Sequence, residues 1–307
     1  MSKTALLFVG QGAQEVGMGR SFYEGSATGK GWFERANKCL GYDLAQICFQ
    51  GPEPELTKTE NAQPAIFLVA WVAFELLKEK PPTLRFDAAA GLSLGEFTAL
   101  TAAGALSFED GLRVVRQRGR LMQAACDRTQ GAMAAVIGLD EKATREVCKE
   151  TGVELANLNC PGQIVISGAT EKITQACDAA KAKGARKAVP LQVAGAYHSK
   201  LMASAQEPLA DVLSKMDVRS PKVQVVSNVT AQPHGGPEQI RKLLVDQMVS
   251  PVRWEASIRY LLAQGFTRFI ELGPGTTLSG FMKRIDKTAQ ILNVADMGSL
   301  ELTAKAF

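Results

Sequence analysis

One serine of the chain stands in a sequence context that is typical of a nucleophile. Residues 91–95 read Gly-Leu-Ser-Leu-Gly, a GxSxG pattern placed between a predicted buried strand over 88–92 and a predicted helix that begins at about Leu94. A serine on such a sharp turn is exposed beside a helix N-terminus, whose free N–H groups stabilise negative charge. A glycine-rich turn of purely structural use is the alternative. In this context we predict that Ser93 is a catalytic nucleophile.

A serine hydroxyl needs a base to take its proton, and the chain has only two histidines. His234 lies in a Gln-Pro-His-Gly-Gly segment, a composition typical of a loop with a solvated side chain. His198 directly precedes a helix predicted over 200–213, and catalytic side chains often lie at the boundary of an element. We therefore favour His198 as the base, with a capping or core role as the alternative.

The first predicted strand, over 4–9, ends in a glycine-bearing turn that reads Gly-Gln-Gly-Ala-Gln over 10–14. The glycines on either side of Gln11 would expose its backbone N–H, as a second oxyanion donor requires. An ordinary glycine turn or a phosphate loop is the alternative. The segment has neither the third glycine nor the following Gly-Lys-Ser/Thr of the nucleotide-binding motifs.

A helix predicted over 109–123, with Ser107 as its N-cap, carries one arginine on its apolar side. At about 100° per residue, three arginines share a solvated arc, whereas Arg118 falls among apolar residues. A guanidinium that points inward needs a carboxylate or phosphate partner, and its planar fork suits a carboxylate. A structural salt bridge is one interpretation. The other is that Arg118 recognises a substrate carboxylate, so that the site prefers a dicarboxylic acyl group to acetyl.

The elements that must position these residues predict an α/β fold. Short apolar strands alternate with amphipathic helices, which indicates a largely parallel sheet. Between 131 and 193 the predicted order is β-α-β-β-α-β, which matches a ferredoxin-like unit. We predict a large α/β-hydrolase-like domain formed by residues 1–128 and 197–307, with a small ferredoxin-like subdomain inserted over 129–196.

Composition argues against several classes of function. The chain has 307 residues, of which 46% are hydrophobic and 21% charged, a net charge of +4 and six dispersed cysteines. It has no run near the ~20 apolar residues of a membrane span, no CxxC pair for a zinc site or a disulfide framework, and no basic cluster of a nucleic-acid binder. We expect a cytoplasmic enzyme without a metal.

Taken together, the motifs resemble those of the malonyl-CoA:acyl carrier protein transacylases of fatty-acid and polyketide synthesis. The similarity extends over nearly the whole chain and rests on segments in the same order as in that family: Gly10–Gln14, Gly91–Glu96, Gln117–Gly119 with Met122–Gln123, Asn159–Gln163, Gly195–Ser199, Ser227–Thr230, Gln247 with Pro251–Trp254, and Glu271–Gly275. One position departs from the commonest pattern, because Leu92 replaces the histidine that precedes the serine.

The resemblance implies a ping-pong transfer of malonyl from malonyl-CoA to acyl carrier protein, with no metal or redox cofactor, by a monomer. In that mechanism Ser93 is acylated and His198 is the base. The remaining roles that we expect are oxyanion donation by the backbone N–H groups of Gln11 and Leu94, substrate binding by Arg118 and Gln63, and orientation of the histidine at Gln247. A serine hydrolase and a non-catalytic module that binds acyl-CoA are the alternatives.

Overall fold

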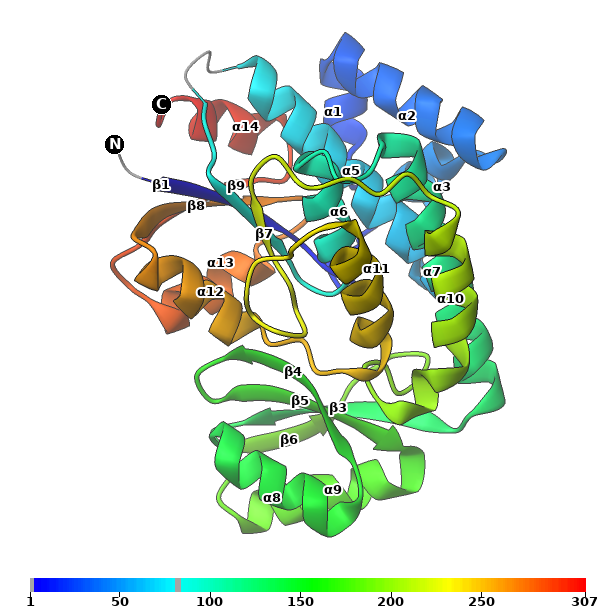
Figure 1. Ribbon diagram of the computed structural model, residues 1–307, viewed down its shortest axis with the longest axis vertical. Coiled ribbons are helices and arrows are strands. Elements are labelled where there is room, and N and C mark those ends of the chain that lie inside the picture. Colours follow the sequence, from blue (N-terminus) through cyan, green and yellow to red (C-terminus); the bar gives the residue numbers. More distant parts are fainter. Residues whose placement is uncertain (1–2, 81–83) are drawn as a thin grey trace.

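The main sheet of the computed structural model is parallel throughout and has the strand order β7-β2-β1-β8-β9 (Figure 1). The structure describes residues 3–80 and 84–307. The strands of this sheet are β1 (Lys3–Phe8), β2 (Ala88–Gly91), β7 (Gln224–Val226), β8 (Phe266–Leu272) and β9 (Gln290–Val294). β1, at the centre, is buried from Thr4 to Phe8, as expected for a parallel strand covered on both faces.

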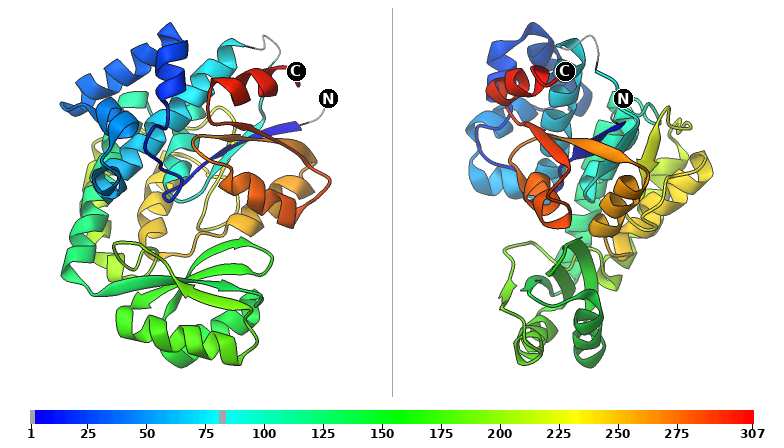
Figure 2. Two further views of the ribbon diagram at one scale, coloured as in Figure 1. Left: turned by 180° about the vertical axis from the view of Figure 1, so that it is seen from behind. Right: turned by 90° about the vertical axis from the view of Figure 1, so that its left-hand side faces the viewer.

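Helices cover both sides of this sheet (Figure 2). They are α1 (Arg20–Gly25), α2 (Ala27–Leu40), α3 (Leu44–Gln50), α4 (Glu53–Thr57), α5 (Thr59–Glu79), α6 (Leu94–Ala102), α7 (Phe108–Arg128), α10 (Gln206–Ser214), α11 (Pro237–Asp246), α12 (Trp254–Ala263), α13 (Thr277–Ile285) and α14 (Met297–Ala304), with the 3-10 helices η1 (Lys200–Ala205) and η2 (Gln247–Val249). α5 is buried along most of its length and packs against α7. The predicted Ser107 cap is present, since its side chain accepts from the Asp110 N–H.

The second sheet is antiparallel and has the order β4-β5-β3-β6. Its elements are β3 (Gly131–Ile137), α8 (Glu141–Thr151), β4 (Glu154–Cys160), β5 (Gln163–Ala169), α9 (Thr170–Ala182) and β6 (Lys187–Pro190). This is the strand order of a ferredoxin-like unit, and the combination of a parallel sheet with this small subdomain confirms the predicted fold class. The exact boundaries at 129 and 196 stay a prediction.

The small sheet uses its two faces differently. One face, with Ala134, Val136 and Ile166, forms a separate core under α8 and α9. On the other face, Met133 and Val165 belong to the core of the large domain. Because side chains alternate along a strand, the small sheet packs against its own helices with one face and against the large domain with the other.

Two predicted elements differ from the structure at their ends. The helix predicted over 200–213 begins as the 3-10 helix η1 and becomes α-helical at Gln206. The strand predicted over 187–193 ends at Pro190, and the next residues, 191–194, line a cavity instead. Within the described ranges, no helix is long and apolar enough to cross a membrane.

Candidate active site

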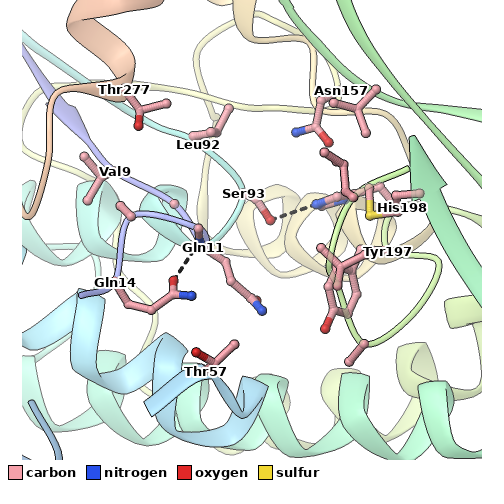
Figure 3. Close-up of a pocket in the computed structure, with 18 of the residues that line it drawn as sticks. Val9, Gln11, Gln14, Thr57, Leu92, Ser93, Asn157, Tyr197, His198 and Thr277 are labelled. Atoms are coloured by element: carbon pink, nitrogen blue, oxygen red, sulfur yellow. Dashed lines mark hydrogen bonds between the residues drawn. The ribbon is translucent and has the colours of Figure 1, made fainter. Parts of the chain in front are cut away.

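A cavity of about 690 Å³ lies between the two sheets (Figure 3). Its walls come from the turn after β1, the turn after β2, the inward face of the small sheet and the segment that precedes η1. The lining includes Gln11, Leu92, Ser93, Met133, Val165, Tyr197 and His198. One cavity therefore contains three of the predicted site residues, namely Gln11, Ser93 and His198.

Ser93 occupies the sharp turn that its sequence predicts. Its backbone has φ 51° and ψ −103°, a region that non-glycine residues rarely adopt and that is typical of a strained functional position. The flanking glycines are required by close contacts. A Cβ on Gly91 would lie 1.9 Å from the Gly95 carbonyl, and one on Gly95 would lie 2.2 Å from the Phe8 carbonyl oxygen. The GxSxG pattern is therefore imposed by the approach of α6 to β1 and β2.

His198 contacts the serine through one ring nitrogen and a backbone carbonyl through the other. Nδ1 lies 2.9 Å from the Gln247 carbonyl oxygen, and Nε2 lies 2.8 Å from Ser93 Oγ. A carbonyl oxygen can only accept, so Nδ1 carries the proton and Nε2 is free to accept from the serine. This geometry is that of a serine with its general base, with a backbone carbonyl in place of an acidic third member.

The pKa of His198 is lowered to about 4, first by burial and then by the nearby positive charge of Arg118. Burial and a neighbouring cation both disfavour the imidazolium. The ring is therefore neutral, and able to accept a proton, far below the pH at which an ordinary histidine becomes charged.

This lowered pKa predicts an acid-tolerant acylation step. At acyl-CoA concentrations well below saturation, where the rate reports the free enzyme, Ser93 acylation should stay nearly constant as the pH falls from 8 to about 5.5. It should decline as the pH approaches the His198 pKa of about 4. Rapid-quench measurement of acyl-enzyme formation across this range tests the prediction, with circular dichroism as the check on folding. A decline centred near 6.5, the ordinary value, would contradict the lowered pKa.

Arg118 is the third polar group at the serine. Its side chain is buried and its exposed fraction is 1%. Nη1 donates to Gln63 Oε1 at 2.9 Å, and Nη2 donates to Gln247 Oε1 at 2.9 Å and to Ser93 Oγ at 3.0 Å. The structural salt bridge that was one interpretation is not present among the described residues, since no carboxylate there lies within ion-pair distance of Arg118.

The environment of Arg118 leaves its guanidinium without a carboxylate in direct contact among the described residues, and the charge of Glu96 reaches it through the Gln247 amide. Its Nε has no hydrogen-bond partner in the described part of the chain, and burial lowers its pKa to about 10. A buried cation whose direct partners are two neutral amides and a hydroxyl gains much from an anionic ligand. The guanidinium lies next to the serine oxygen, and its predicted role in binding a substrate carboxylate stays a prediction.

Gln63 and Gln247 hold the guanidinium from two sides. Gln63 is fully buried and lies outside the cavity lining, and its Nε2 contacts Met122 Sδ at 3.2 Å. In the structure Gln63 contacts Arg118, and its predicted role in binding the substrate stays a prediction. Gln247 supports Arg118 with its side chain and His198 with its backbone carbonyl.

The two predicted oxyanion donors lie in the turns that follow β1 and β2. Leu94 is the first residue of α6, directly after Ser93, and Gln11 lies in the cavity wall after β1. The structure records no hydrogen bond from either backbone N–H to another described residue. Both groups are therefore free to donate to a substrate oxygen, and their role stays a prediction.

Sequence reasoning was wrong about His234. We expected a solvated loop residue, but the exposed fraction of the whole residue is 8%, that of its side chain is zero, and its Nε2 lies 2.6 Å from Glu96 Oε1. Its loop folds back on β7, because the His234 N–H donates to the Val225 carbonyl at 2.8 Å. This pairing is non-local, and the composition of the loop does not indicate it.

Glu96 and Asn228 were also missed as individual site residues. The Asn228 side chain accepts from the Ser93 N–H at 2.7 Å and donates to the Gly91 carbonyl at 2.8 Å, so it braces the turn. Glu96 stands three residues after the helix N-cap Ser93, a spacing that resembles a capping box. The carboxylate instead accepts from the Asn228 N–H and from Gln247 Nε2.

The fold and this arrangement define an enzyme of the serine acyl-transfer class. A family model described as "Acyl transferase domain" matches residues 5–302, and the chain belongs to that family. A malonyl CoA-acyl carrier protein transacylase of Bacillus subtilis is 45% identical, over 98% of this chain and 96% of the relative.

Solved structures of transacylases have the same fold. The malonyl CoA-acyl carrier protein transacylase of Coxiella burnetii superposes with a TM-score of 0.96 at 36% identity, covering 99% of this chain and 97% of that chain. A malonyl-transacylase in complex with a type II polyketide-synthase acyl-carrier protein superposes with a TM-score of 0.96 at 38% identity, over 100% of both chains.

Proposed function

We propose that this chain transfers a malonyl group from malonyl-CoA to the phosphopantetheine thiol of acyl carrier protein, through a malonyl-Ser93 intermediate. The observation that carries the proposal is Arg118. Its guanidinium is buried, no described carboxylate lies within ion-pair distance of it, and Nη2 lies 3.0 Å from the serine oxygen. The similar proteins that are named as malonyl transacylases support the same substrate.

The first half-reaction follows from the contacts of Ser93. His198 Nε2 takes the hydroxyl proton as Oγ attacks the malonyl thioester carbonyl, and the carbonyl oxygen becomes an oxyanion that the N–H groups of Gln11 and Leu94 bind. Collapse of this tetrahedral intermediate breaks the carbon–sulfur bond. The proton on His198 goes to the departing thiolate, so coenzyme A leaves as a thiol and malonyl-Ser93 remains.

The second half-reaction is the reverse with a different thiol. His198 takes the proton of the carrier's pantetheine thiol, the thiolate attacks malonyl-Ser93, and collapse returns the proton to Ser93 Oγ. The same groups serve both directions, as a ping-pong transfer requires. The product is a malonyl thioester of the carrier, which supplies fatty-acid or polyketide synthesis.

Arg118 would give the site a preference for malonyl over acetyl. The malonyl carboxylate would form a bidentate, charge-assisted pair with a guanidinium that is already desolvated and oriented. Acetyl would leave that cation unpaired. The pair also neutralises the charge that helps to lower the His198 pKa, so binding of the correct acyl group makes His198 a stronger base.

A serine hydrolase has the same nucleophile and base, and its turnover distinguishes it. Without a carrier, a transacylase should release about one equivalent of coenzyme A per enzyme and then stop, and holo acyl carrier protein should restart the release. Continuous release of coenzyme A together with free malonate in the absence of the carrier would establish the hydrolase. No release under either condition would favour a binding module.

The remaining expectations are part of this proposal. The reaction as written uses no metal and no redox cofactor. All six cysteines are free thiols, which suits the reducing cytoplasm that we propose as the site of action. We also propose that the enzyme acts as a monomer, which light scattering coupled to size-exclusion chromatography would test.

A further inference from the structure

We propose that His234 is a positioning residue for malonyl transfer, acting through Glu96 and Gln247 on both His198 and Arg118. The proposal rests on the proposed function. His234 lies outside the cavity lining and touches neither Ser93 nor Arg118 among the described residues. Its connection to the chemistry runs through one fully buried carboxylate.

Glu96 is a buried carboxylate with a donor on each oxygen. The side chains of Glu96 and His234 have no exposed surface. Oε1 of Glu96 is within 2.6 Å of His234 Nε2, while Oε2 accepts from Gln247 Nε2 at 2.5 Å and from the Asn228 N–H at 3.1 Å. A buried carboxylate needs a donor for each oxygen. His234 is the recorded side-chain donor to Oε1, and it therefore determines how the carboxylate is turned.

The orientation of the Gln247 amide is set by its partners. Arg118 can only donate, so Gln247 Oε1 must face Arg118 Nη2, and Nε2 must then face Glu96 and the Ser93 carbonyl. A rotated amide would bring Nε2 against the guanidinium and Oε1 against two acceptors. The position of the Glu96 carboxylate thus fixes the amide, and the amide fixes one side of Arg118.

Gln247 contacts both the general base His198 and the guanidinium of Arg118. Its backbone carbonyl accepts from His198 Nδ1 at 2.9 Å, and its side chain accepts from Arg118 at 2.9 Å. A substitution that displaces Gln247 therefore affects both the base, His198, and the guanidinium of Arg118 that would bind the malonyl carboxylate. Loss of the His234 contact should lower the rate of Ser93 acylation by every acyl-CoA. The rate with malonyl-CoA should fall the most, because only malonyl has a carboxylate for Arg118 to bind.

Three variants separate this role from a purely structural one. His234→Leu removes the donor, whereas His234→Gln can place an amide N–H near the position of Nε2. Gln239→Ala is the matched control, because Gln239 Oε1 accepts from the Gly235 N–H and so supports the same loop without contacting Glu96. Each variant is checked for its thermal transition and then mixed with malonyl-CoA or acetyl-CoA, and Ser93 acylation is followed by rapid quench and intact mass.

We expect His234→Leu to acylate with malonyl about 10-fold more slowly, the size of effect typical of a residue that orients a group in contact with the chemistry. The ratio of malonyl to acetyl rates should fall as well. His234→Gln should recover most of the malonyl rate, and Gln239→Ala should match the wild type. If His234→Leu does not fold, His234→Asn takes its place, since its shorter amide cannot reach Glu96 in the same position.

Two results would overturn the inference. In one, His234→Leu is acylated at the wild-type rate by both malonyl-CoA and acetyl-CoA. In the other, malonyl and acetyl rates fall by the same factor in all variants, in proportion to the folded fraction. A wild-type protein that forms no malonyl adduct would instead refute the proposed function, so the two failures are distinguishable.

Discussion

Replacing Ser93 by alanine should abolish the acyl-enzyme, with a loss of turnover of about 10⁶-fold, the scale seen when a catalytic serine is removed. The reason is that no other described nucleophile occupies the turn between His198 Nε2 and Arg118 Nη2. Intact-mass measurement after mixing with malonyl-CoA should show the unmodified mass only. An adduct of undiminished yield in Ser93→Ala would show that another residue is acylated.

A companion variant separates loss of chemistry from loss of folding. Ser93 has φ 51°, and strain of this kind costs about 1–3 kcal/mol in a non-glycine residue. Ser93→Gly should therefore be more stable than Ser93→Ala by about 1 kcal/mol in chemical denaturation, while neither variant forms an adduct. Equal stability of the two variants would argue against strain at this turn.

Replacing Arg118 by alanine should change the acyl preference as well as the rate. Loss of one partner from a buried ion pair costs about 3–5 kcal/mol, which corresponds to acylation by malonyl-CoA that is slower by roughly 10²- to 10⁴-fold. Acetyl has no carboxylate for Arg118 to bind, so its rate should fall much less. Parallel rapid-quench measurements with the two acyl-CoA substrates give the ratio directly.

The control for this variant lies on the same helix. Arg120 is half-exposed and pairs with Glu60 at 3.1 Å, so Arg120→Ala should leave both rates within about 2-fold of the wild type, as surface pairs contribute little. A uniform loss of malonyl and acetyl rates in Arg118→Ala would mean that Arg118 supports the site without recognising the carboxylate.

Local patterns were sufficient for much of this site. The strand, turn and helix around Ser93 can be predicted because the glycines are required by contacts within that same segment. The inward position of Arg118 follows from helical periodicity alone. Both predictions depend on residues that are close in the sequence, where backbone geometry determines the outcome.

The supporting network could not be predicted in the same way. His234 was assigned to solvent because its neighbours are typical of a loop, yet the loop pairs with β7 and buries the ring against Glu96. Gln247 lies 49 residues from His198 in sequence and contacts it through a backbone atom, which leaves no side-chain signature. These contacts depend on how distant segments meet, and only the family resemblance pointed to Gln247.

The fate of the malonyl-enzyme tests the central claim most directly. The protein is loaded with malonyl-CoA, freed of excess substrate and divided, and one half receives holo acyl carrier protein while intact masses of both proteins are followed. We predict a malonyl adduct on Ser93 that persists without the carrier and moves to the carrier when it is present. No adduct on Ser93, or an adduct that decays to free malonate at the same rate with and without the carrier, would contradict it.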